Sequence, residues 1–273
     1  MENIVVPIDF SMQSEYAFKV AASIAKKHDA NLYALHMLEL NEALISSSES
    51  FHPEQTVFFM KLAEKRLGEF LDKPYLKGVK VVPIIKHFKV FSEISTVAKE
   101  NNADLIVMGS HGSEGLKEIF VGSNTQKVVR YSDIPVLIIK EEIVDFDPQQ
   151  MLFACDLKEE NIHAFKRAKY ISEVFGSELR LVYVNTPGDA FLSTSEIQQK
   201  ILAFCDKVGF ELLVAVYNDY SVETGVLNFG AESKADIIGI PTHGRKGISH
   251  FFLGSIGEDV ANHSTLPVVT FKI

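Results

Sequence analysis

Three glycines and a serine in the stretch MGSHGSEGLKEIFVGSNTQKVV, residues 108–129, stand at spacings that suit the binding of an anion. Gly109 and Gly112 are three residues apart, and nine residues separate Gly112 from the pair Gly122-Ser123. Glycine tolerates backbone conformations that other residues avoid, so the same spacing is also typical of turns. The alternative is a bed of backbone N–H groups under a phosphate, with Ser123 capping a helix whose N-terminus adds partial positive charge.

An internal repeat indicates which elements position these residues. IVVPIDFS at the start of the chain matches MLFACDLK, and AFKVA matches AFKRA, both at an offset of 147 residues. ADLIVMGSHG matches ADIIGIPTHG at an offset of 132 residues. The first copy therefore carries about fifteen more residues than the second. We place them in the polar stretch NEALISSSESFHPEQ, which suits an exposed loop.

Each copy alternates strand and helix patterns. Nearly continuous apolar runs, typical of strands covered on both faces by helices, predict five strands in the first copy. These runs are residues 4–8, 31–37, 80–85, 105–109 and 135–139. Residues at helical spacing predict two intervening helices. They are Ala17, Ala21, Ile24 and Ala25, with Ser14 as a cap, and then Phe59, Ala63, Leu67 and Phe70.

In the second copy, Ser193 and Glu196 form a capping-box pattern ahead of a helix. The alternation predicts an α/β fold of two tandem doubly wound domains, each a five-stranded parallel sheet flanked by helices. We set the domains at residues 1–142 and 148–273, because EEIVDFDPQQ between them has no room for an element of its own.

The ends of two strands predict where a ligand binds, because ligands of open parallel sheets lie beyond the carboxyl ends of strands, where the strand order reverses. Asp9 follows the first strand and Gly109 the fourth. If these strands are neighbours, Asp9 can accept hydrogen bonds from a base amino group or a ribose hydroxyl beside the phosphate-binding glycines. The alternative, a turn glycine and an aspartate that caps a helix, stays open.

These residues resemble the universal stress proteins in their tandem two-domain form, whose fold is similar to that of the adenine-nucleotide α-hydrolases. In ATP-binding members the pattern Gly-x-x-Gly, nine residues, Gly-(Ser/Thr) holds ribose and phosphates, and the first copy fits it completely. VPID, ALHM and PVLIIK are similar as well. The resemblance implies ATP, with Mg²⁺, as the ligand. It implies adenine contacts from Pro7, Ile8, Asp9 and the backbone of Met37, and phosphate or ribose contacts from Met108, Gly109, Gly112, Gly122, Ser123 and Asn124.

The second copy departs from this pattern. Pro241 stands at the position of Gly109, where it removes a backbone donor and fixes φ. At the predicted base pocket the second copy carries Cys155, Asp156, Leu157 and Lys158. In its glycine loop, Arg245 and Lys246 offer positive charge where the first copy has Ser113 and Glu114. We therefore expect the nucleotide site in the first copy. The weaker second site comprises Asp156, Val184, Gly244, Gly254 and Ser255.

Composition excludes several classes of function. A formal net charge of −9 argues against a broad nucleic-acid surface, and no segment reads as a signal peptide or membrane span. We therefore expect a cytoplasmic protein. The two cysteines and nine histidines show no zinc-like spacing, so we expect no metal site in the protein itself.

The sequence favours binding over catalysis. It contains no P-loop, no Gly-x-Gly-x-x-Gly and no Gly-x-Ser-x-Gly, and the Ser-Gly-Gly-x-Asp-Ser loop of the α-hydrolase enzymes is absent. His111 and His243 could act as a base, but the favoured interpretation is that each imidazole caps or packs its own loop. We expect a nucleotide-responsive module with at most slow ATP hydrolysis. The alternative is a scaffold whose copies dock through their sheet edges and helix faces, with the glycine loops kept only as structure. In either case we expect the terminal strands, PVLIIK and PVVTFK, to pair between copies or in a homodimer.

Overall fold

The computed structural model describes residues 1–38, 53–87, 90–110, 122–242 and 255–273. The described strands form one ten-stranded sheet in the order β3-β2-β1-β4-β5-β10-β9-β6-β7-β8. The first copy supplies β1 (Asn3–Ile8), β2 (Asn31–Leu38), β3 (Lys80–His87), β4 (Leu105–Gly109) and β5 (Val136–Ile139). The second supplies β6 (Gln150–Ala154), β7 (Glu178–Asn185), β8 (Val214–Asn218), β9 (Ile237–Thr242) and β10 (Val268–Lys272). Both copies therefore repeat one strand order, arranged head to head.

The two copies join through their last strands. Strands pair in parallel within each copy, but β5 and β10 pair antiparallel, with Leu137 opposite Val269. The predicted α/β fold with five parallel strands per copy is confirmed, and the PVLIIK and PVVTFK strands pair within the chain. This pairing covers two apolar edges and leaves β3 and β8 as the outer strands. On β3, Pro83 has no N–H to offer to a further strand.

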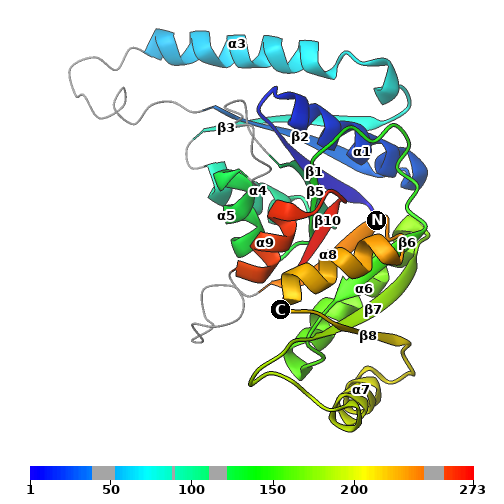
Figure 1. Ribbon diagram of the computed structural model, residues 1–273. Coiled ribbons are helices and arrows are strands. Elements are labelled where there is room, and N and C mark those ends of the chain that lie inside the picture. The colour runs from blue at the N-terminus through cyan, green and yellow to red at the C-terminus, as the bar shows by residue number, and fades with distance from the viewer. Residues whose placement is uncertain (39–52, 88–89, 111–121, 243–254) are drawn as a thin grey trace, which may run out of the picture.

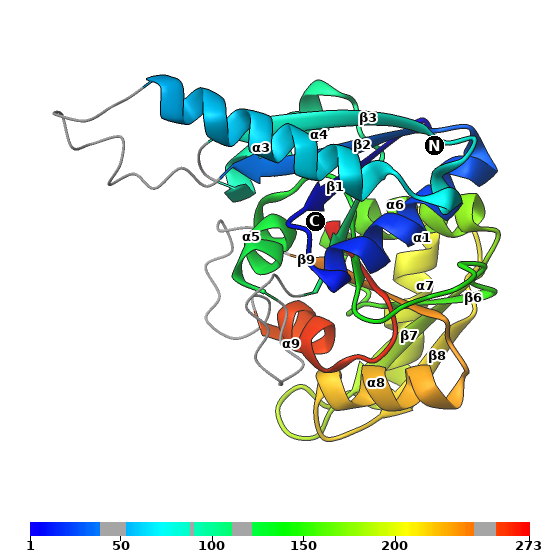
Figure 2. The same cartoon turned by 90° about the horizontal axis from the view of Figure 1, so that it is seen from above.

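Helices cover both faces of the sheet (Figures 1 and 2). One face carries α1 (Met12–His28), α3 (Pro53–Leu71), α6 (Ile162–Phe175) and α7 (Thr194–Val208). The other carries α4 (Val90–Glu100), α5 (Ser123–Tyr131), α8 (Val222–Glu232) and α9 (Ser255–His263). Two 3₁₀ turns are also present, η1 (Pro74–Leu76) and η2 (Glu159–Asn161). Helices on both faces explain why the strand patterns are continuously apolar.

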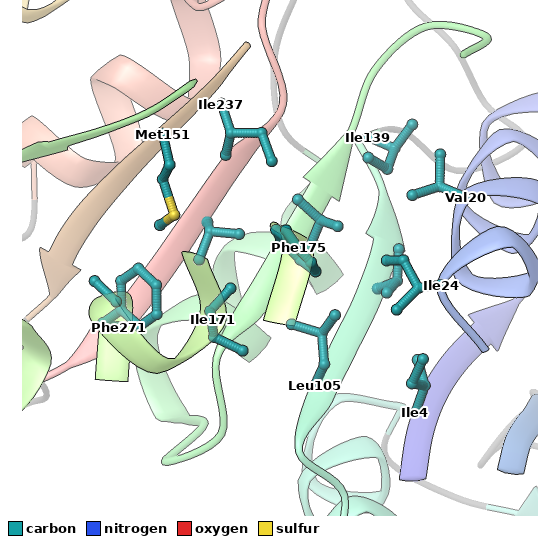
Figure 3. Packing of buried hydrophobic residues seen from close by; sticks show 14 of the residues in the cluster. Ile4, Val20, Ile24, Leu105, Ile139, Met151, Ile171, Phe175, Ile237 and Phe271 are labelled. Atoms are coloured by element: carbon teal, nitrogen blue, oxygen red, sulfur yellow. The ribbon is translucent and has the colours of Figure 1, made fainter. Parts of the chain in front are cut away.

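The core runs across the junction between the copies. Figure 3 shows Phe175 of α6 between first-copy residues such as Leu105 and second-copy residues such as Phe271. The labelled side chains of this cluster are almost completely buried. Because one cluster includes side chains from both copies, the hydrophobic effect favours their association as well as the folding of each copy.

The element predictions hold within about one or two residues at most boundaries. The capping box of Ser193 and Glu196 is confirmed at the start of α7. The predicted cap Ser14 is wrong, because Ser11 caps α1 and its side chain accepts from the backbone N–H of Ser14 at 3.1 Å. Most of NEALISSSESFHPEQ lies outside the described residues, and α3 begins within its last part at Pro53.

Candidate functional site

The first and fourth strands of the first copy are neighbours, as the predicted ligand site requires. β1 lies between β2 and β4, with Val5 opposite Ile106, so the strand order reverses beside Asp9 and Gly109. Helix α1 leaves the end of β1, and α5 begins beside the end of β4. Because both helices start at the carboxyl edge of the sheet, the positive ends of two helix dipoles lie on this edge.

Asp9 shapes the turn into α1 and still presents an oxygen. Its Oδ1 accepts hydrogen bonds from the backbone N–H of Ser11 at 2.9 Å and from the Ser11 hydroxyl at 2.5 Å. Among the described residues no contact is found for Oδ2, and the side chain is exposed. The turn passes through Phe10 in the left-handed region at φ 65°, which bulky residues rarely adopt. Asp9 is therefore both a turn residue and a candidate acceptor for a ligand.

Gly109 is required by packing. A Cβ at this position would lie 2.7 Å from the backbone carbon and oxygen of Gln13. The absence of a side chain therefore lets the first turn of α1 approach the end of β4. The sequence analysis assigned Gly109 to the approach of a phosphate, and the structure adds this second reason for a glycine.

Hydrogen bonds hold the start of α5 against the end of β4. The Gly122 N–H donates to the Ser110 carbonyl, and the Thr125 hydroxyl donates to the Gly109 carbonyl at 3.0 Å. The N-cap of α5 is Gly122, so Ser123 is the first helical residue and the prediction that Ser123 is the cap is wrong. In the described residues no side chain caps this helix, and its first turn carries no acidic residue. Its first N–H groups, including those of Ser123 and Asn124, are thus suited to an anion.

The remaining described candidates of the first copy lie on β1, β2 and β4. Ile8, Met37 and Met108 are buried at the ends of their strands. Pro7 is half-buried on β1 opposite Leu35. Gly112 and His111, like Ser113 and Glu114, lie outside the described residues.

An aromatic and cationic stack adjoins this edge. The ring of Phe10 lies 4.4 Å from that of His36 and 4.8 Å from the guanidinium of Arg66. The His36 Nδ1 lies 2.8 Å from the Ile8 carbonyl oxygen, so the neutral ring donates from Nδ1. Burial lowers the pKa of His36, whereas the bond to Ile8 opposes that shift. The stack thus presents an uncharged imidazole beside the proposed base pocket at neutral pH.

In the second copy the equivalent carboxylate is occupied. Asp156 Oδ1 accepts from the Asn161 amide at 2.5 Å and from the Lys158 backbone at 3.1 Å. Its Oδ2 lies 2.7 Å from the Lys158 amine. Val184, which stands at the repeat position of Met37, is covered by α8, since a Cβ on Gly225 would lie 2.5 Å from it. The pairing of Asp156 leaves this carboxylate less open to a base or ribose than Asp9, whereas Val184, 8% exposed, is about as buried as Met37 at 9%.

The phosphate side of the second copy also differs. Pro241 is buried within β9, and Thr242 follows it with its hydroxyl donating to the Phe271 carbonyl. At the repeat position of Thr125 stands Gly257, where a Cβ would lie 3.2 Å from the Thr242 methyl. Ser255 begins α9, whereas Gly244, Gly254, Arg245 and Lys246 lie outside the described residues with His243.

Charge at the two helix starts differs as well. Glu258 and Asp259 follow the start of α9 at the repeat positions of Gln126 and Lys127 in α5. Acidic side chains near a helix N-terminus compete with a bound anion for the same positive end of the dipole. Ile256 replaces Asn124 at the second helical position. The two copies are therefore unequal in charge and in polar groups.

Comparison with known proteins agrees with the repeat. The model of the universal stress protein family matches residues 1–140 and again residues 148–272. A Staphylococcus aureus (strain USA300) protein, provisionally named a universal stress protein, is 31% identical over 152 residues, which are 54% of this chain and 90% of that protein.

The chain belongs to the universal stress protein family. Among solved structures, a universal stress protein from Archaeoglobus fulgidus is similar to it with a TM-score of 0.75 and 23% identity, over 99% of this chain and 98% of that one. A provisionally named universal stress protein from Pseudomonas aeruginosa is similar with a TM-score of 0.67 and 17% identity, over 100% and 93% of the two chains. At these identities the likeness shows the fold alone. In this universal stress protein, no helix within the described ranges is long and apolar enough to cross a membrane.

Sequence reasoning missed several residues at the first copy's candidate site in this universal stress protein. Thr125 and Ser110 hold the start of α5, and His36 and Arg66 each lie against the ring of Phe10. For Thr125 a signal was present, because a hydroxyl residue two positions after Ser123 faces Gly257 in the repeat. For Arg66 there was none, since its contact depends on how α3 packs over the turn at Phe10.

Proposed function

We propose that the first copy binds an adenine nucleotide, ATP with Mg²⁺, at the carboxyl edge of β1 and β4. The single observation that carries this proposal is the adjacency of the Asp9 turn and the uncapped, acid-free N-terminus of α5. Asp9 can accept hydrogen bonds from donors of a base or ribose, and the N-terminus of α5 can bind phosphate oxygens. This universal stress protein also carries in its first copy the complete glycine pattern of the ATP-binding members that it resembles.

The described residues fit such a ligand. Oδ2 of Asp9 is an acceptor open to solvent, suited to an amino or hydroxyl donor. The backbone N–H groups of Ser123 and Asn124 are oriented by the helix and need no net positive charge on the protein. Mg²⁺ accompanying ATP would keep phosphate oxygens and water as its main ligands, so the protein needs few ligands of its own.

We infer that the second copy binds nucleotide weakly or not at all. Asp156 is engaged by Lys158 and Asn161, and Pro241 replaces a backbone donor at the end of β9. Glu258 and Asp259 add negative charge near the start of α9. Each change lowers the affinity for the base or for phosphates independently, so restoring one residue does not restore the site.

The proposed activity is binding, with at most slow hydrolysis. Fast phosphoryl transfer to water needs a base or a water-positioning group together with fixed cations at the transferred phosphate. Within the described part of the first site, Asp9 and His36 already make hydrogen bonds at the turn into α1. The ligand then acts by its different affinity for two conformations or assembly states.

Mass spectrometry of the denatured supernatant tests this function. We expect the purified wild-type protein to release an adenine nucleotide and to gain thermal stability with added Mg-ATP. Gly122→Val should lose both the bound nucleotide and the stabilisation. The backbone at Gly122 (φ −58°, ψ 150°) accepts a β-branched residue, so such a loss would not come from backbone strain. The matched control Gly254→Val, at the repeat position in the second copy, should keep both.

The second candidate, a scaffold that binds no nucleotide, makes the opposite forecast. The β5–β10 pairing joins the two copies without any nucleotide, so a scaffold would need the glycine loops only as structure. Absence of nucleotide from the wild type, together with no stabilisation by Mg-ATP, would refute the binding proposal and favour the scaffold.

A further inference from the structure

The outer edge of β8 presents backbone groups that no other described segment pairs with. β8 is the last strand of the sheet, at the opposite end from β3 (Figure 1). Just after β8, the backbone N–H of Asp219 donates to the Asn185 carbonyl of β7 at 3.3 Å. In a parallel pair only alternate residues of a strand bond to the same neighbour, so the N–H and carbonyl groups of Val214, Val216 and Asn218 point away from β7. These three residues therefore offer donors and acceptors to a further strand.

β8 lacks the features that guard the other outer strand. β3 carries Pro83 between Lys80 and Lys86, and proline and lysine on an edge strand both discourage the addition of another strand. The sequence of β8 is VAVYN, without a proline or a charged residue. Leu213 and Tyr220, on either side of it, are 91% and 92% exposed. An apolar strand edge of this kind favours pairing with another strand.

The chain already joins two apolar strand edges in the same manner. β5 and β10, of four and five residues, pair antiparallel and hold the two copies together. β8 has five residues, so it is as long as the strands that form this junction. Because β5 and β10 pair with each other, neither of these two edges is left for a contact between molecules. Of the two outer strands that remain, β8 is the unguarded one.

β8 is complementary to itself about a twofold axis at Val216. In the antiparallel register centred there, Val216 faces Val216 of a second molecule and Val214 faces Asn218. Since these are the residues whose backbone groups point outward, each of them meets a hydrogen-bonding partner. The two valines at the axis also form a cross-strand pair of β-branched side chains, and Val216 is 43% exposed in the single chain.

Charge is compatible with this register beyond the ends of β8. Glu211 and Asp219 are the charged residues of 211–221. Continued past β8, the register places Glu211 opposite Ser221 and Asp219 opposite Leu213, so no acid meets another acid. Like charges directly opposite each other would destabilise the pair. The segment therefore carries no charge pattern that opposes pairing with itself.

We propose that β8 pairs antiparallel with β8 of a second molecule, which makes the protein a twofold homodimer with one sheet continuous across both chains. The outer strands of this dimer are the two β3 strands, each guarded by Pro83, so assembly stops at two molecules. A strand edge buries little surface compared with a permanent interface. The dimer should therefore dissociate on dilution.

Sedimentation velocity of the full chain at increasing concentrations tests this pairing. We expect the wild type to shift from monomer to dimer. Val216→Lys places two positive charges opposite each other at the axis and should abolish the dimer. The matched control is Val82→Lys, the same substitution at a residue that is 38% exposed on β3, and it should dimerise as the wild type does.

A mixture of Val216→Lys and Val216→Glu tests the register itself. Each variant alone should stay monomeric, whereas the mixture should form a heterodimer because lysine then faces glutamate across the axis. A folding defect in either variant could not produce this rescue. Circular dichroism of each variant verifies that the fold is retained.

Four results would overturn the proposal. A wild type that stays monomeric at every concentration would do so, and the edge would then be left to a strand of a different protein. So would a dimer that survives Val216→Lys or is abolished by Val82→Lys, because the contact then lies elsewhere. The third is growth beyond the dimer, which a closed twofold contact does not allow. The last is a mixture of the Lys and Glu variants that does not associate.

Discussion

The side-chain amine of Lys140 lies 2.6 Å from the carbonyl oxygen of Asn262, at the end of the last helix of the other copy. It also donates to the carbonyl of Ser264 at 2.5 Å. Lys272, the repeat equivalent of Lys140, donates in turn to the carbonyl of Arg130 at the end of α5 at 2.6 Å. Each copy therefore supplies the cation for the negative helix end of the other, and both of these helices begin at a glycine-containing candidate site.

The Lys140 contact predicts a pH-dependent stability. Burial lowers the pKa of Lys140 from 10.5 to about 8 in the folded chain. Between these values the unfolded chain binds more protons than the folded one, so this group's contribution to stability rises with pH, by at most about 1.4 kcal/mol per pH unit. Below pH 8 both states are protonated and the contribution is constant.

We expect the wild type to gain unfolding free energy relative to Lys140→Met as pH rises from about 8 to about 10. Urea denaturation of both proteins across this range measures the difference. Parallel stability curves would show that the two carbonyl oxygens hold the ammonium charged throughout, contrary to the lowered pKa.

Alanine substitutions at Gly109 and Gly68 should change the free energy of unfolding in opposite directions. Gly109→Ala places a Cβ 2.7 Å from the backbone of Gln13, so we expect a loss of about 1–3 kcal/mol from overpacking. Gly68→Ala, inside α3 with no atom within 4 Å of the new Cβ, should gain about 0.5–1 kcal/mol from helix propensity. Chemical denaturation distinguishes the two, and an Ala at position 109 without cost would mean that α1 does not approach β4 this closely.

Thr125 predicts a specific hydrogen-bond effect at the start of α5. Thr125→Val keeps the shape but removes the donor to the Gly109 carbonyl, and the side chain is buried, so we expect a loss of about 1–3 kcal/mol. Thr125→Ser keeps the hydroxyl and should retain more of the stability. Equal unfolding free energies for the Val and Ser variants would argue that the hydroxyl contributes nothing.

The fold was largely predictable because repetition and apolar periodicity act locally. Strand patterns such as residues 105–109 coincide with β4, and the capping box at Ser193 follows from side chains three residues apart. The cap of α1 was misassigned to Ser14 because two hydroxyl residues, Ser11 and Ser14, precede the apolar stripe and the sequence does not distinguish between them. The bond from Asp9 to Ser11, which favours the earlier start, depends on the left-handed turn at Phe10.

The candidate site was predictable only in outline. Asp9, Gly109 and Gly122 follow strands or open helices, so their common edge follows from strand order. The engagement of Asp156 by Asn161 and the cover of Val184 by Gly225 depend on tertiary packing, which no spacing in the sequence encodes. The same holds for the junction lysines, since Lys140 and Asn262 are 122 residues apart.

Pro241 was given the main role in the second copy's predicted weakness, and the structure distributes that role over several residues. Because Asp156 stays paired with Lys158 and Gly257 still replaces Thr125, Pro241→Gly should leave the number of nucleotides bound per chain unchanged. Equilibrium dialysis with labelled ATP measures that number. An increase from one to two would assign the weakness to the proline alone.

Isothermal titration calorimetry with Mg-ATP tests the central claim most directly. The account predicts one site per wild-type chain, loss of that site in Gly122→Val, and an unchanged single site in Gly254→Val. Two equivalent sites, or a single site that survives Gly122→Val and disappears in Gly254→Val, would contradict the assignment of nucleotide binding to the first copy.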